Sequence, residues 1–157
     1  MPTKTAKSPA KRKTSRRSPA PRVVVQYVQT NRRPVAPTRL IKLLGEGLPV
    51  SELDDLQAAL DLPLVSLAGL LGISKATLQR RKKEERLTPE ESDRVVRYAR
   101  LMGRAVDVLD SQDAARQWLR APQAGLGGET PLDYARTEVG AREVENLLGR
   151  IEHGVYS

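Results

Sequence analysis

The chain has 157 residues, and its 27 Lys and Arg against 19 Asp and Glu give a formal net charge of +8. It has no cysteine and one histidine, which excludes disulfides and thiolate or histidine-cluster metal sites and leaves little material for histidine-based catalysis. No apolar run approaches the roughly 20 residues that a membrane span requires, and no apolar leader follows the first residue. We expect a soluble, cytoplasmic protein that needs no cofactor and contacts no membrane.

The excess positive charge lies in residues 1–22, which contain Lys and Arg but no acidic residue. The other residues of this segment are small or polar, so it cannot bury enough apolar surface to offset its ordering entropy, and we predict that it is disordered. Three functions remain open for it: a phosphate-contacting arm, a solubilising leader and an organellar transit peptide. The rest of the chain carries no net charge, so the high total charge is no evidence for a basic folded surface.

Residues 23–28, Val-Val-Val-Gln-Tyr-Val, have a strand-like composition. Because no second strand is evident, we expect an extended linker or a single edge segment here. Pro34 and Pro37 then interrupt regular structure. We therefore assign residues 1–37 to a disordered basic arm with its linker.

From residue 38 onward the apolar residues recur with helical spacing. A short helix is expected to end at Gly45 or Gly47, and the next to open around Ser51. The run Thr88-Pro-Glu-Glu91 predicts a capping box at the start of a long helix that reaches Leu109. Further helix starts are predicted at Ser111, Thr130 and Thr137. The expected fold class is all-α, with a DNA-binding domain at 38–110 and a small helical domain at 111–157.

Residues 63–84 fit a helix-turn-helix. Ala68 is small enough for close helix crossing, Gly72 tolerates a positive φ at the turn, and Leu78 locks the second helix inward. Ser74 is placed to cap the second helix, whose first residues can then enter the major groove of double-stranded DNA. The candidate DNA-contacting residues are Ser74, Lys75, Thr77, Gln79, Arg80 and Arg81.

Arg81 departs from the usual pattern, because the position three residues after Leu78 is normally apolar and packs inward. Either the second helix is tilted or its buried contact ends early. The basic run 80–83 also has an interpretation as a solvated helix end whose cations face the C-terminal dipole. Since one such domain binds DNA weakly alone, we expect a homodimer that reads a palindrome, with the helix from Pro89 to Leu109 as a candidate dimer contact.

Four segments resemble a single protein family. They are residues 71–81, residues 87–94, the Gly-Gly-Glu-Thr-Pro-Leu-Asp block at 127–133, and the Gly-Arg-Ile-Glu-His-Gly-Val-Tyr ending at 149–156. Together they are similar to the Xre/MbcA/ParS family of bacterial antitoxins over roughly residues 39–157. The resemblance implies a type II antitoxin whose C-terminal domain binds a RES-domain toxin that consumes NAD⁺. It also implies that the complex represses its own operon.

In that family the C-terminal segment lies in or over the active-site cleft of the toxin. The resemblance therefore implies toxin contacts by Arg150, Glu152, His153, Val155, Tyr156 and Ser157. Tyr156 is the best single anchor, because buried aromatics carry much of the energy of an interface. Each of these residues also has a purely structural interpretation, as solvated helix charges, as a partner of the helix dipole, or as apolar groups that fold back onto the chain's own core.

Catalysis has little support in the sequence. The carboxylates near Thr88 and Thr130 are accounted for as helix starts, and no Gly-rich phosphate loop or nucleophile–base pair is recognisable. We expect a protein that is not an enzyme. The alternative function is a stand-alone helix-turn-helix transcriptional regulator or nucleoid-associated protein, and a third is an interaction module that has lost DNA binding.

Overall fold

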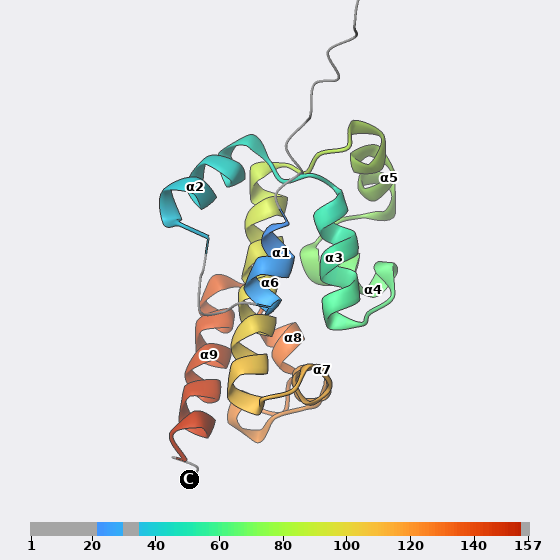
Figure 1. Ribbon diagram of the computed structural model, residues 1–157. Helices are drawn as coiled ribbons and strands as arrows, with labels where there is room; N and C mark the ends of the chain where they lie inside the picture. Colours follow the sequence, from blue (N-terminus) through green and yellow to red (C-terminus); the bar gives the residue numbers. More distant parts are fainter. Residues whose placement is uncertain (1–21, 30–34, 155–157) are drawn as a thin grey trace, which may run out of the picture.

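The computed structural model describes residues 22–29 and 35–154, so the predicted disordered arm lies outside the described residues except for Arg22. Within those ranges the chain is helical, with one isolated bridge between Pro49 and Arg86, and the all-α prediction is confirmed (Figure 1). The elements are α1 (Val23–Gln29), α2 (Pro37–Glu46), α3 (Ser51–Leu60), α4 (Leu64–Leu71), α5 (Lys75–Glu84), α6 (Pro89–Leu109), α7 (Gln112–Arg120), a 3₁₀ turn (Ala124–Leu126), α8 (Pro131–Tyr134) and α9 (Glu138–Glu152).

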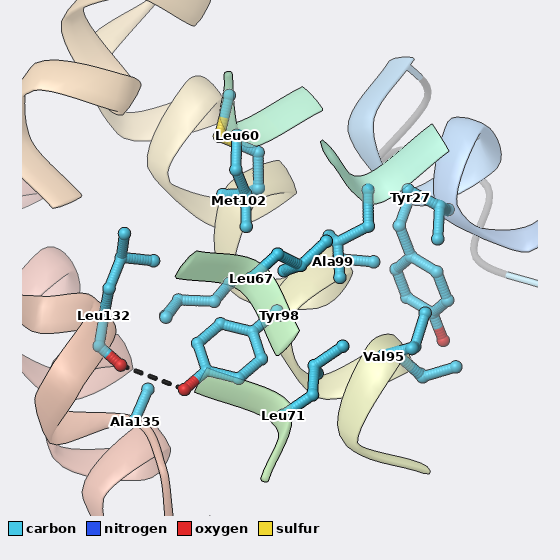
Figure 2. Close-up of a cluster of buried hydrophobic side chains, with 14 of the residues drawn as sticks. Tyr27, Leu60, Leu67, Leu71, Val95, Tyr98, Ala99, Met102, Leu132 and Ala135 are labelled. Atoms are coloured by element: carbon cyan, nitrogen blue, oxygen red, sulfur yellow. Dashed lines mark hydrogen bonds between the residues drawn. The ribbon is translucent and has the colours of Figure 1, made fainter. Parts of the chain in front are cut away.

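Helix α6 is the axis around which the other helices pack (Figure 1). It contacts α1, α2, α3 and α4 from the first half of the chain and α7 and α9 from the second. Figure 2 shows its side chains Tyr98, Ala99 and Met102 in one apolar cluster with Leu67 of α4 and Leu132 of α8. The Tyr98 hydroxyl donates a hydrogen bond to the Leu132 carbonyl at 3.0 Å, and burial raises the pKa of Tyr98 to about 12. Both halves of the chain therefore share a single core.

Helix α1 corrects the prediction of an extended linker or edge segment at its residues. Val23, Val24, Tyr27 and Val28 are buried, and α1 packs on α6 and α3. The buried Glu52 side chain accepts hydrogen bonds from the backbone N–H groups of Val23 at 2.7 Å and Val24 at 3.0 Å. Burial raises the pKa of this carboxyl, against the opposite effect of the two bonds. Tertiary burial and a long-range cap thus outweigh the weak preference of valine for strands.

Helix α6 offers no apolar face for the dimer contact that the sequence predicts on it. The neighbouring helices cover its apolar stripe, and its exposed residues are Pro89, Glu90, Asp93 and Asp107. The dimer contact on α6 therefore stays a prediction, to which the exposed residues of this helix add no support.

The predicted helix starts carry the predicted capping contacts. Thr88 and Glu91 form a complete capping box at α6, in which each side chain bonds the other residue's backbone N–H. Side chains also cap α5, α7, α8 and α9, at Ser74, Ser111, Thr130 and Thr137. The short helix α2 continues through Gly45 and ends at Gly47, which has a φ of 81°.

Arginines of the second half bind backbone carbonyls at the ends of helices of the first half. Arg116 on α7 donates to the Ala59 carbonyl at 2.8 Å, near the end of α3. Arg136, just after α8, donates to the Gly69 carbonyl of α4 at 3.0 Å. The last carbonyls of a helix lack intrahelical partners, and cations are favoured beside them. These bonds fix how the helices that follow α6 sit on α3 and α4.

Candidate functional site

Helices α4 and α5 form the predicted helix-turn-helix. Leu67, Leu71 and Leu78 are buried between the two helices and α6. Gly72 has a φ of 67°, so the turn uses a left-handed conformation that glycine adopts without strain. Ser74 then caps α5 by accepting a hydrogen bond from the Thr77 backbone N–H at 3.2 Å. The turn and the cap are where the sequence predicted them.

The candidate DNA-contacting residues separate into an exposed group and an internally bonded group. Lys75, Gln79 and Arg80 are exposed and make no hydrogen bond or ion pair with another described residue. Thr77 is half-buried, and its Oγ1 accepts a bond from the Ser74 hydroxyl at 2.9 Å. Ser74 and Thr77 are thus engaged with each other at the helix start, whereas the first three side chains are free to meet a ligand.

Arg81 points into the protein. Its side chain is 12% exposed, and its Nε donates to the carboxylate of Glu91 at 2.7 Å while Nη1 donates to Glu84 at 3.0 Å. Burial acts to raise the pKa of Glu91, but the bonds from Arg81 and Thr88 outweigh it and lower the pKa. Arg81 therefore fills the inward position as an ion pair that fastens α5 to the start of α6. Geometry gives no support to its predicted contact with DNA.

Glu91→Gln is expected to cost more stability at neutral pH than in acid. The folded pKa of Glu91 lies below its ordinary value of 4.5, so its stabilising effect is fully present above that pH and is lost as the pH falls through the lowered pKa. Urea unfolding of both proteins from neutral to acidic pH measures the difference in unfolding free energy. A difference that does not shrink toward acid would show that the charge of Glu91 contributes nothing.

Most described cations outside α5 are bound within the protein. Arg94, for example, donates to the Leu71 carbonyl at 3.0 Å, and Arg86 donates to the carbonyls of Glu46 and Gly47. Within the described ranges, the Lys and Arg side chains without a hydrogen bond or ion pair are Arg39, Lys42, Lys75, Arg80, Lys82, Lys83 and Arg150. Free positive charge is therefore concentrated on α5, with a smaller share on α2 and one residue near the end of α9.

The end of α9 forms the second candidate surface. Arg150 and His153 are exposed and line an open groove, whose other lining residues are Arg104, Glu143, Glu145, Asn146 and Gly149. Glu152, predicted to bind the toxin, is bonded to Arg104 of α6, and this bond lowers the pKa of Glu152. Val155, Tyr156 and Ser157 lie outside the described residues. The structure thus brings Arg150 and His153 together and gives Glu152 an internal partner.

The ion pair at Glu152 is the last of a series that sequence reasoning missed. The acidic partners recur every seven residues along α9, so they lie on one face of that helix. Their guanidinium partners lie three and four residues apart on α6. The pairs are Arg97–Glu138 at 3.1 Å, Arg100–Glu138 at 3.1 Å, Arg100–Glu145 at 2.7 Å and Arg104–Glu152. This spacing is visible in the sequence and was the available signal that α6 and α9 pair side by side.

Other kinds of site find no support in the described part of the chain. No helix there is both long enough and apolar enough to cross a membrane. Nor does any group of three or more His, Asp and Glu side chains in those ranges come close enough together to hold a metal ion.

Known proteins match both halves of this arrangement. Residues 39–100 match the Antitoxin Xre-like helix-turn-helix domain, and residues 104–154 match the Antitoxin Xre/MbcA/ParS C-terminal toxin-binding domain. An Antitoxin Xre of Yersinia enterocolitica is 37% identical over 122 residues, covering 76% of this chain and 82% of the relative. An Antitoxin Xre of Photorhabdus laumondii is 39% identical over 117 residues, covering 73% and 79%.

A more distant relative carries a different name. The "Prs ADP-ribosylating antitoxin" of a Sphingobium species is 27% identical over 132 residues, covering 78% of this chain and 83% of the relative. The two domain matches meet within α6, the helix that both halves share. Because both matched domains are binding domains of a regulator, the prediction that the chain is not an enzyme is confirmed. The chain belongs to the Xre/MbcA/ParS family of antitoxins, with a helix-turn-helix domain followed by a C-terminal toxin-binding domain.

Proposed function

We propose that this antitoxin uses its C-terminal region to inhibit a RES-domain toxin, which is an enzyme that consumes NAD⁺. We also propose that the antitoxin represses its own operon through α5. The observation that carries the proposal is the distribution of free cations. Lys75, Arg80, Lys82 and Lys83 lie on α5 in the helix-turn-helix domain, and Arg150 lies in the toxin-binding domain. Helix α5 and the end of α9 lie toward opposite ends of the molecule (Figure 1), so both partners can be held at once.

The groove at the end of α9 suits an active-site cleft that handles a nucleotide. Arg150 and His153 offer exposed hydrogen-bond donors, and such donors pair well with phosphate oxygens and carboxylates. The Arg104–Glu152 pair holds the last turn of α9 on α6. The name of the Sphingobium relative associates an antitoxin with ADP-ribosylation, a reaction that consumes NAD⁺.

The free face of α5 supports the proposal of operator binding. A helix-turn-helix places its second helix in the major groove, and two copies on a palindrome sit about one duplex turn apart. We therefore propose a homodimer on double-stranded operator DNA, in the bacterial cytoplasm. Exposed lysine and arginine side chains also supply the phosphate contacts that make DNA affinity fall with salt.

The toxin contact is tested with the neighbouring gene, which we expect to encode the toxin. This gene is expressed together with the full chain or with a chain that ends at Gly154, and growth and cellular NAD⁺ are measured. We expect the full chain to restore both and the shortened chain to fail, although it keeps every described helix. A cut after Gly149 would be less informative, because it removes Ile151, which packs against the core, and so mixes folding with binding.

A crossed pair of variants separates the two surfaces. Arg150→Ala with His153→Ala is expected to weaken toxin inhibition about tenfold or more and to leave DNA affinity unchanged, whereas Arg80→Ala should do the reverse. Full protection by the chain ending at Gly154 and by the Arg150/His153 variant would contradict the C-terminal mechanism. A neighbouring gene that is not toxic, together with intact DNA binding, would favour the stand-alone regulator.

A further inference from the structure

We infer that α5 reads base edges directly through Ala76, Gln79 and Arg80, and that the operator half-site presents a thymine methyl group, an adenine and a guanine to them. The inference rests on the proposed operator binding and adds the chemistry of the sequence that is recognised. Three properties of α5 carry it: the contacts that hold the helix, the face that they leave outward, and the residue types on that face.

The orientation of α5 about its own axis is fixed by two inward side chains. Leu78 is 6% exposed in the shared core. Arg81, three residues later, is held by the carboxylate of Glu91 at the start of α6. Side chains three residues apart in a helix lie on the same side. An apolar contact and an ion pair therefore fix the rotation of α5 about its own axis and define its outward face.

The outward face is made of four exposed side chains. At about 100° per residue, the direction opposite Leu78 and Arg81 passes through Ala76 and Lys83, with Gln79 and Arg80 on either side. Ala76, Gln79, Arg80 and Lys83 are all exposed, and none is engaged with another described residue. Gln79 and Arg80, which flank the middle of this face, are therefore unpaired and lie on opposite sides of it.

The residue types on this face match particular base edges in the major groove. A glutamine side chain forms two hydrogen bonds with N6 and N7 of adenine, and an arginine side chain forms two with O6 and N7 of guanine. Alanine contacts the methyl group of thymine. Ala76 also leaves a gap in the first turn, so the backbone of α5 can approach the base pairs without a long side chain in the way. Sequence reasoning passed over Ala76, because it is neither charged nor polar.

The lysine on the same face has a different role. Lys83 lies seven residues after Ala76, which is about 10 Å along the helix axis. Residues at the start of a recognition helix reach the bases, and residues farther along meet the backbone. Lys83 is therefore assigned to a phosphate. Ser74 and Thr77 bond each other at the helix start, so they contribute to the shape of this end rather than to base readout.

Selection of binding sites from a pool of random duplex DNA tests the assignment. The full chain is compared with Gln79→Ala, Arg80→Ala and Lys83→Ala, and affinities for the selected site are measured at several salt concentrations. We expect Gln79→Ala to lose the preference at one A·T pair and Arg80→Ala at one G·C pair, each by roughly 5- to 150-fold. Lys83→Ala should keep the selected sequence, bind all sites more weakly, and flatten the slope of log affinity against log salt by about 0.9.

Two matched controls and one DNA substitution complete the test. Gln117→Ala and Arg142→Ala change exposed residues of α7 and α9 and should leave DNA selection unaltered. Replacing the critical thymine by uracil removes only its methyl group, and should weaken the full chain but not Ala76→Gly. Uniformly weaker binding by the Gln79 and Arg80 variants with an unchanged selected sequence would overturn the base readout and leave operator binding standing. Failure of the full chain to bind any duplex would overturn both.

Discussion

Gly47→Ala is expected to lower the free energy of unfolding by about 3 kcal/mol or more and to remove operator binding. A Cβ at Gly47 would lie 2.1 Å from the Leu87 carbonyl oxygen, and the residue has a φ of 81°, which a side chain disfavours. The oxygen cannot turn away cheaply, because the N–H of the same peptide group, that of Thr88, donates to the Glu91 carboxylate at 3.0 Å. The substitution would therefore push the link between α2 and α3 away from the link between α5 and α6.

Alanine substitutions at two other glycines separate the steric cost of Gly47→Ala from its conformational cost. Gly45 lies inside α2, and a Cβ there would meet nothing within 4 Å, so Gly45→Ala is expected to stabilise the protein by up to about 1 kcal/mol. Gly128 has a φ of 87° and the same open surroundings, so its alanine variant carries only the conformational cost, about 1–2 kcal/mol. Urea unfolding and a gel-shift with operator DNA measure all three. If Gly47→Ala and Gly128→Ala unfold at the same midpoint, the contact with Leu87 relaxes without cost.

The features that the sequence predicted correctly are local ones. A capping box such as Thr88 with Glu91 involves residues three positions apart, so its physical chemistry is contained in a short window. The turn of the helix-turn-helix is equally local, since Gly72 and Ser74 act on their immediate neighbours. The prediction of an extended segment at α1 was wrong because the interactions that decide its structure are not local. Its valines become helical because of burial on α6 and because Glu52, nearly thirty residues later, bonds its first N–H groups.

The candidate sites were predictable to different extents. The sequence identified Arg81 as unusual, but only the approach of α6 reveals that Glu91 is its partner. Likewise, the sequence placed Glu152 among the toxin-binding residues, and only the packing of α9 on α6 reveals its ion pair with Arg104. Whether a charged side chain is free or occupied depends on which helices meet, and propensity or spacing within one helix carries little of that information. Lys75, Gln79 and Arg80 remain predicted DNA contacts. Their side chains are exposed and make no hydrogen bond or ion pair with another described residue.

Gly140→Ala is expected to remove toxin inhibition and to lower the free energy of unfolding by about 3 kcal/mol. A Cβ on Gly140, in the first turn of α9, would lie 1.8 Å from the Tyr134 carbonyl oxygen and 2.9 Å from its carbonyl carbon. Both atoms belong to backbone, so relief requires α8 and α9 to move apart. That movement would disturb the cap of α9, where the Thr137 side chain accepts from the Gly140 N–H at 3.0 Å, and with it the helix that carries Arg150 and His153.

Gly149→Ala is the matched control for the stability part of this prediction. Gly149 also lies in α9, and a Cβ there meets only the tip of Arg104 at 4.0 Å, so we expect a gain of up to about 1 kcal/mol. Toxin inhibition, DNA affinity and urea unfolding are measured for both variants. We expect Gly140→Ala to keep most of its DNA affinity under conditions where it remains folded, because α5 is fastened to the other end of α6 by Arg81 and Glu91. Parallel loss of both activities would mean instead that the corner of α8 and α9 controls α5 through the shared core, where Tyr98 bonds Leu132.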